Sequence, residues 1–160
     1  MFAENLVINR KEIKYKGIFE DKSTVETLIK EFEKHDYFVS KKRKSVSGKK
    51  IEDDLIFLKH KDDYVELKVR VRVTEQSEKK LHEKNKRTVR KGEVNIIFDG
   101  FVVDKKTISG GINLVVKVAL QNLLNMGSRF AAESSIKSDV KNIAEEINAE
   151  LHLNKYKLKE

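Results

Sequence analysis

Two short segments hold the residues with the clearest chemical potential, and that potential is anion binding. The first, Lys41–Lys50, reads KKRKSVSGKK and contains six basic residues and no acidic one. The second, Lys79–Lys91, contains seven basic residues against Glu83 alone. Lysine and arginine at this density can neutralise phosphate groups and release their counterions. The candidate nucleic-acid-binding residues in the two segments are Lys41, Lys42, Arg43, Lys44, Lys49, Lys50, Lys79, Lys80, Lys84, Lys86, Arg87, Arg90 and Lys91.

The excess of positive over negative charge is confined to these two segments. The net charge is +8, yet the 137 residues outside the segments carry 21 basic and 25 acidic groups. Neither segment contains an aromatic residue, so base stacking on single strands is not the expected mode. Recognition of the shape and phosphates of structured RNA fits better. The alternative is a pair of solvated loops whose lysines discourage edge-to-edge pairing of strands.

Other site chemistries have weaker support. The chain has no cysteine, which excludes disulfides and thiolate chemistry, and no GxSxG motif. Neighbouring carboxylates at Asp53-Asp54 and Asp62-Asp63 are better explained as surface or turn residues than as an acid/base pair. We therefore expect no enzyme, no catalytic residue, no metal and no cofactor. The histidines show no metal-binding spacing and are scattered at His35, His60, His82 and His152.

One glycine pair resembles a phosphate-binding loop in composition. The segment Lys105–Asn113 (KKTISGGIN) places Gly110-Gly111 just before an expected helix, where free N–H groups attract anions. The GxxxxGK[ST] spacing is absent. A flexible connection from strand to helix is the favoured interpretation.

Alternation of apolar and polar residues predicts the strands that would position the basic segments. The clearest strand, Tyr64–Thr74, places valines and a leucine on one face and charged residues on the other. Of the charged residues, Lys68, Arg70 and Arg72 would extend a basic surface along the open face of the sheet. The predicted strands are Asn9–Phe19, Tyr37–Lys44, Leu55–Lys61, Tyr64–Thr74 and Glu93–Asp104.

Asp99-Gly100 lies within the last of these strands and has two interpretations. It could form a type I′ hairpin turn, or it could mark a bulge in one long strand. The short apolar run that follows it favours the bulge slightly.

Helices are predicted before and after this group of strands. Ser23 and Glu26 form a capping box for a helix over Thr24–His35. The apolar stretch Ile112–Phe130 predicts a second helix, which Gly127-Ser128 should kink or end, and the periodic set from Ile136 to Leu151 predicts a third. The helix Ile112–Phe130 has more apolar surface than one packing face needs, so a homodimer through it is possible.

The resulting order is β-α-β-β-β-β-α-α, which predicts one α+β domain over residues 1–160. We expect an antiparallel meander of about five strands with the helices packed on one face. Alternate turns of a meander lie at the same end of the sheet. The turn near Ser45–Gly48 and the loop Glu75–Lys86 should therefore converge, with Lys61–Asp63 at the opposite end.

The sequence gives no sign of export or of a membrane. The first residues lack the pattern of a signal peptide, and Ile112–Met126 is too short and too polar to span a bilayer. A cytoplasmic protein with no membrane partner is expected.

The pattern VNIIFDGFVV, set after KVRVRV and before a long helix, resembles small uncharacterised archaeal α+β proteins. This resemblance covers about half of the chain and implies no activity and no site residues. The order of elements is also similar to that of helix-grip ligand-binding domains, although strands expected before the first helix are missing.

The leading hypothesis from the sequence is a non-catalytic, RNA-binding accessory protein. Its two basic loops would grip structured RNA, with ribosomal RNA or a ribosomal surface as the expected partner. Two alternatives stay open. One is an oligomerising protein–protein assembly module that meets an acidic partner, and the other is a helix-grip pocket for an apolar ligand.

Overall fold

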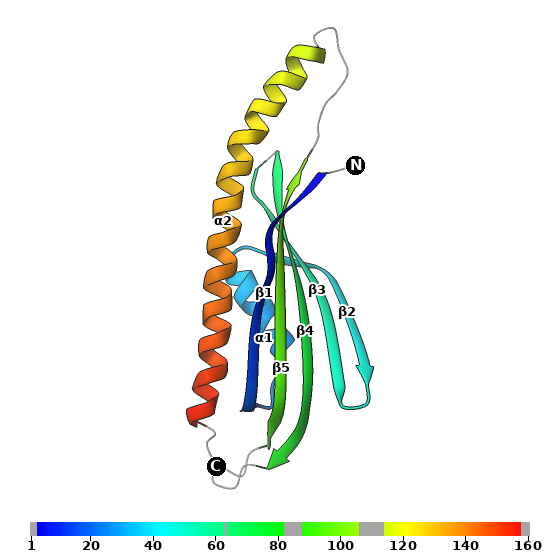
Figure 1. Cartoon of the computed structure of the whole chain (residues 1–160), viewed down its shortest axis with the longest axis vertical. Coiled ribbons are helices and arrows are strands. Elements are labelled where there is room, and N and C mark those ends of the chain that lie inside the picture. Colours follow the sequence, from blue (N-terminus) through cyan, green and yellow to red (C-terminus); the bar gives the residue numbers. More distant parts are fainter. Residues whose placement is uncertain (1–2, 63, 82–87, 106–113, 158–160) are drawn as a thin grey trace.

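The computed structural model describes residues 3–62, 64–81, 88–105 and 114–157 (Figure 1). It confirms the predicted α+β class, with an antiparallel sheet and helices on one of its faces. Most strands extend further than the periodicity predicted. The elements are β1 (Ala3–Glu20), α1 (Thr24–Lys34), β2 (Phe38–Ser47), β3 (Lys50–His60), β4 (Val65–Leu81), β5 (Thr88–Asp104) and α2 (Leu114–Lys157).

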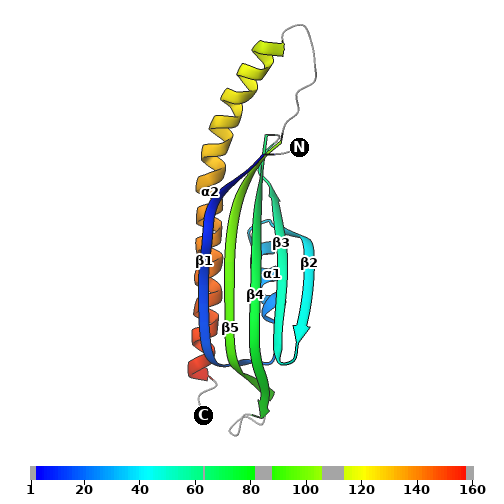
Figure 2. The same cartoon turned by 45° about the vertical axis from the view of Figure 1, so that its right-hand side comes forward.

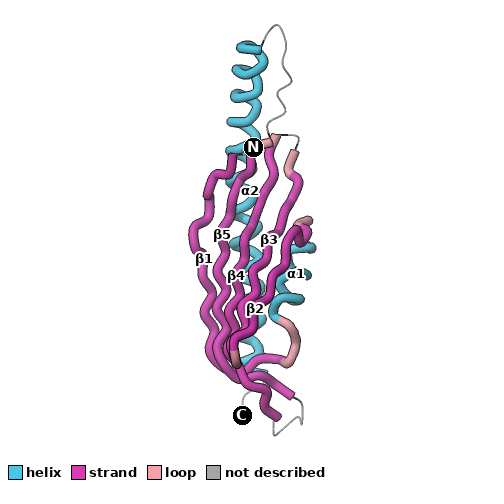
Figure 3. The backbone as a smooth tube through the Cα atoms, turned by 90° about the vertical axis from the view of Figure 1, so that its right-hand side faces the viewer, coloured by secondary structure: helices cyan, strands magenta, loops and turns pink. Residues whose placement is uncertain are grey.

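The five strands lie in the order β1-β5-β4-β3-β2, and every neighbouring pair is antiparallel. Strands β2 to β5 form the predicted meander. Strand β1 joins the far side of β5, so β1 and β2 are the two outer strands of the sheet. Figure 3 shows α1 and α2 behind the sheet, on the face that we call the inner face; the opposite face is the outer face.

The core fills the space between the inner face and the two helices. Along β4, buried valines and a buried leucine alternate with more exposed residues. The ring of Phe32 on α1 stacks on Phe57 of β3 with 3.9 Å between centroids and also contacts Phe98 of β5. Ile136 and Ile143 of α2 are fully buried in the same cluster. Burial of this apolar surface is the main force that holds the helices on the sheet.

Helix α1 begins as predicted. Ser23 caps it, because its side-chain oxygen accepts a hydrogen bond from the Glu26 N–H group. The connection from α1 to β2 turns sharply at Asp36, which has a φ of 67°. Helix α1 thus begins at the Ser23 cap and is followed by the turn at Asp36.

Asp99-Gly100 lies inside one continuous strand. The pairing of β5 with β4 runs through both residues without a register shift, so the hairpin alternative is wrong. The irregularity is in the facing strand β1, where the register shifts on both sides of Ile8. Arg10 adopts a φ of 53° there, and its N–H group donates to Asp99 Oδ1 at 2.9 Å. A Cβ atom at position 100 would lie 3.0 Å from Ile8 Cδ1 and 3.2 Å from Ile136 Cδ1, so a larger residue would require these side chains to shift.

The prediction of two C-terminal helices is wrong. Helix α2 is one helix of 44 residues that continues through Gly127 and Ser128. A glycine in a helix costs only about 1 kcal/mol relative to alanine, and the chain has no proline to break the helix. Figure 1 shows that the first part of α2 extends beyond the end of the sheet.

The meander places successive turns at opposite ends of the sheet and alternate turns at the same end, as predicted. Lys50 pairs with Gln76, and Leu81 pairs with Thr88, so the β2–β3 turn and the ends of β4 and β5 share one end of the sheet. Figure 2 shows this end at the bottom. We call it the basic end. The β3–β4 turn lies at the opposite end, where Asp62 accepts backbone hydrogen bonds.

Candidate nucleic-acid interface

The first basic segment begins on β2, an outer strand of the sheet. Every residue of β2 except Val39 is exposed. Lys41, Lys42, Arg43 and Lys44 therefore form a run of four exposed cations, which we call the β2 cations. None of them makes an ion pair with a residue that the structure describes.

The β2 cations point to both sides of the sheet edge. Lys42 lies beside Leu55 of β3, a buried residue of the inner face, whereas Arg43 lies beside Asp54 on the outer face. Because side chains alternate along a strand, Lys44 shares the inner face with Lys42, and Lys41 shares the outer face with Arg43. An anionic partner at this edge could be contacted from both faces.

The turn after β2 brings the first basic segment against β4. Gly48 has a φ of 62°, the left-handed conformation that a tight turn favours. Lys49 extends from this turn and forms an ion pair with Glu78 of β4. Lys50 forms an ion pair with Glu52 at 3.1 Å.

The second basic segment lies beside this turn. A surface hollow of about 320 Å³ is lined by Lys49 of the first segment and by Lys79, Lys80 and Lys91 of the second, together with Glu78. The convergence of the two segments at one end is thus present in the described residues. Three of the candidate residues, Lys84, Lys86 and Arg87, lie outside the described residues.

The predicted extension along the outer face is largely neutralised. Lys68 pairs with Glu4 at 2.9 Å, and Arg72 lies 3.5 Å from Asp99. Lys68 and Arg72 are therefore already paired with carboxylates of the same chain, although the sequence pattern predicted that they would face a partner.

Arg70 is the most firmly paired residue of that row. It donates two hydrogen bonds to Asp54, from Nε at 3.1 Å and from Nη2 at 2.8 Å. The hydrogen bond from Arg70 lowers the pKa of the Asp54 carboxyl. The outer-face row therefore contributes less free positive charge than β2 does.

Arg90 faces inward and is part of the fold. Its Nη1 donates to the buried Glu75 at 2.6 Å, and its guanidinium lies 4.9 Å from the ring centroid of Phe19. It also donates to the Lys22 carbonyl and lies 3.5 Å from Asp21. Arg90 thus ties β5 to β4 and to the connection between β1 and α1.

The sequence did not point to a second hollow, which lies on the inner face near the start of α1. It has a volume of about 330 Å³, and Lys44, Lys79 and Arg90 line it together with acidic residues. One of the acids is Asp53, which is only 8% exposed. Burial raises the pKa of its carboxyl, against the opposing effect of Lys44 and Lys42. The sequence does contain one signal for this hollow. Asp53 and Asp54 are neighbours on a strand, so one of the two must point to the inner face.

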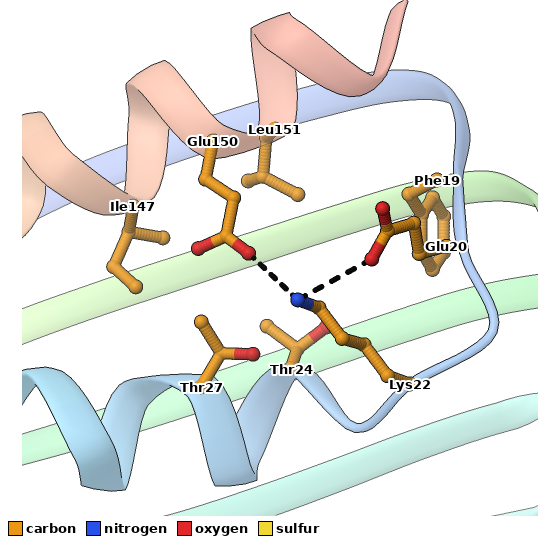
Figure 4. A pocket seen from close by; sticks show the side chains of 8 residues that line it. All are labelled: Phe19, Glu20, Lys22, Thr24, Thr27, Ile147, Glu150 and Leu151. Carbon is orange, nitrogen blue, oxygen red and sulfur yellow. Dashed lines mark ion pairs between the residues drawn. The ribbon is translucent and has the colours of Figure 1, made fainter. Parts of the chain in front are cut away.

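The space enclosed by α1, α2 and β1 offers little room for an apolar ligand. The hollow in Figure 4, between α1, α2 and β1, has a volume of about 30 Å³, which suits a water molecule. Lys22 bridges its mouth, 3.0 Å from Glu150 and 3.3 Å from Glu20. Between α1 and β3 the layer is filled by the aromatic stack of Phe32 and Phe57. This packing speaks against a helix-grip pocket.

The remaining sequence candidates do not assemble into a site. Within residues 3–62, 64–81, 88–105 and 114–157, no group of three or more potential ligands could hold a metal ion. His35 lies 3.7 Å from Asp139, and His152 contacts the ring of Tyr15. His82 and Gly110-Gly111 lie outside the described residues. None of the described helices contains an apolar stretch of the length that crossing a bilayer requires.

Comparison of the chain with protein-family models, with curated proteins and with solved structures finds no match.

Proposed function

We propose that this protein is a non-catalytic binder of structured RNA and that it contacts the phosphate backbone with its basic end. The β2 cations provide the main contacts. A second group of contacts comes from Lys49 in the β2–β3 turn and from Lys79, Lys80 and Lys91 on β4 and β5. Such contacts supply affinity and position the protein without reading the base sequence.

The single observation that carries the proposal is the unpaired state of the β2 cations among the described residues. Several other cations of the sheet are paired with acids, as Lys68, Arg70 and Arg90 show. These four consecutive exposed cations outnumber the two nearby carboxylates that attract them, Asp53 and Asp54, so an excess of like charge remains on β2. A polyanion would relieve that repulsion on binding.

Structured RNA fits this surface better than a single strand. Neither basic segment contains Phe, Tyr or Trp, so neither segment supplies such a ring for a base to stack on. Exposed cations along a rigid strand suit a regular series of phosphates, as a helical RNA presents.

The test compares two variants of equal charge in binding to a fluorescent hairpin RNA. The β2 variant changes Lys41, Lys42, Arg43 and Lys44 to Gln. Gln is preferred to Glu because Asp53 and Asp54 lie on the adjacent strand. The control changes four exposed lysines elsewhere to Gln, so both variants fall from +8 to +4; these are Lys11, Lys30, Lys137 and Lys141.

We expect the β2 variant to bind the hairpin about tenfold or more weakly than the parent near physiological salt, because four phosphate contacts are lost. The control should bind like the parent. Equal binding by the two variants, or no binding by the parent, would overturn the proposal.

A second candidate function follows from the position of β2 rather than from its charge. As an outer strand it presents unpaired backbone N–H and C=O groups, to which an acidic peptide could add as a further strand. The same anisotropy assay with an oligoglutamate peptide separates the two. A parent that binds the peptide but not the hairpin RNA would favour the protein partner.

A further inference from the structure

Helix α2 has two parts with different surroundings. From Arg129 onward it lies on the inner face, where Arg129 pairs with the buried Asp104. The buried residues of this part are Ala132, Ile136, Val140, Ile143, Ala144, Ile147 and Leu151. The part before Arg129 runs past the end of the sheet in the views of Figures 1 and 2. We call this part, extended by two residues to Phe130, the projecting segment (residues 114–130).

The projecting segment carries exposed apolar side chains in a regular line. Leu123 and Met126 are each 66% exposed, and Phe130 is 80% exposed. With the exposed Ala119 they are spaced four, three and four residues apart. This is the spacing of the a and d positions of a coiled coil. We call these four residues the α2 seam.

The α2 seam is separate from the face that packs on the sheet. Ala132 and Ile136 begin the buried line, and Ala132 is two residues from Phe130, or about 200° around the helix. The apolar residues of the α2 seam therefore do not serve the fold of one chain. Large exposed side chains in such a line mark a contact with another surface.

We propose that the α2 seam pairs, antiparallel, with the α2 seam of a second copy of this chain. Antiparallel pairing places Ala119 opposite Phe130 and Leu123 opposite Met126. The smallest residue then faces the largest, so the four positions fill the interface evenly. Parallel pairing would stack Phe130 on Phe130 and leave a gap between the two Ala119 residues.

The inference is independent of RNA binding, since the α2 seam and the β2 cations lie on different elements.

Light scattering on the parent tests whether the pair forms. We expect a dimer for the parent, and a monomer of unchanged helix content when Leu123 and Met126 are both changed to Gln. As a matched control, Leu153→Gln alters a half-exposed leucine of the same helix outside the α2 seam and should leave the dimer intact. A parent that stays monomeric at all concentrations, or a Leu153→Gln variant that dissociates as readily, would overturn the proposal.

Cysteine cross-linking tests the orientation, and the chain has no cysteine to interfere. Ala119→Cys alone should not form a disulfide dimer, because two copies of position 119 lie about 16 Å apart along an antiparallel pair. Phe130→Cys alone should not either. A mixture of the two proteins should form the mixed disulfide. Self-linked dimers of Ala119→Cys would instead show a parallel pair and contradict the proposal.

Discussion

At the scale of single residues, Asp53 and Asp54 show how the sheet gives neighbours opposite properties. Asp53 lies on the inner face, where burial raises the pKa of its carboxyl. Asp54 lies on the outer face, where the hydrogen bond from Arg70 lowers the pKa of its carboxyl. Alternation along the strand predicts the two faces from the sequence. It cannot predict the partner across the sheet, because that depends on the register with β4.

This contrast predicts opposite effects of two matched substitutions on stability. The raised pKa means that the folded state binds a proton at Asp53 more tightly than the unfolded state does. The contribution of this protonation to the free energy of unfolding is lost as the pH rises through the folded pKa. Asp53→Asn should therefore raise the free energy of unfolding at pH 7, and the gain should disappear below pH of about 4, the ordinary pKa of aspartate. Urea unfolding between pH 3 and 8 would measure it. A loss of stability at pH 7 would contradict the assignment.

Asp54→Asn is the matched control, with the opposite sign. Its lowered pKa gives stability that is present above a pH of about 4 and is lost as the pH falls through the folded pKa. Removing it should cost about 0.2–1 kcal/mol at pH 7, because the pair with Arg70 is partly exposed. An equal response of the two variants to pH would show that the faces do not differ.

Arg90 separates the structural arginines from the binding surface. Arg90→Gln leaves Glu75 buried without its charged partner and should cost about 3–5 kcal/mol of stability. Arg70→Gln removes an exposed pair and should cost about 0.2–1 kcal/mol. Chemical denaturation would measure both losses. Below its unfolding transition, the Arg90→Gln variant should still bind hairpin RNA like the parent. Loss of RNA binding with normal stability would instead show that Arg90 contacts the RNA.

At the scale of elements, the strands and α1 could be predicted because their apolar residues repeat with a clear period. The second half of β4, TEQSEKKL, could not, since its apolar alternation stops at Val73. It stays in the sheet through pairing with β5, which runs from Glu75 with Val94 to Leu81 with Thr88. The place of β1 beside β5 could not be predicted either, since periodicity within a strand does not identify its neighbour.

Gly127 tests whether α2 is one helix. A Cβ atom at Gly127 would meet nothing within 4 Å. Gly127→Ala should therefore increase the helical circular dichroism and stabilise the helix by up to about 1 kcal/mol. Gly92→Ala is the contrasting variant, because its Cβ would lie 2.1 Å from the Gln76 carbonyl oxygen and should destabilise the sheet. Loss of helical signal in Gly127→Ala would indicate a break at this glycine.

At the scale of the whole molecule, the topology turns two distant basic segments into one basic end. Counting charges along the sequence located both segments, and the meander rule placed them together. What could not be predicted is which cations have acidic neighbours. Lys68 and Arg72 lie on the expected face, but Lys68 is paired with Glu4 of β1 and Arg72 with Asp99 of β5. The candidate surface is consequently smaller than the charge pattern implied and is centred on β2.

The salt dependence of RNA binding tests this central claim most directly. Each phosphate contact lowers the slope of log Kobs against log salt by about 0.9, so loss of the four β2 cations should make that slope shallower by about three to four. The control with Lys11, Lys30, Lys137 and Lys141 changed to Gln should keep the slope of the parent. A parent slope near zero, or the same slope for the parent and the β2 variant, would contradict the account.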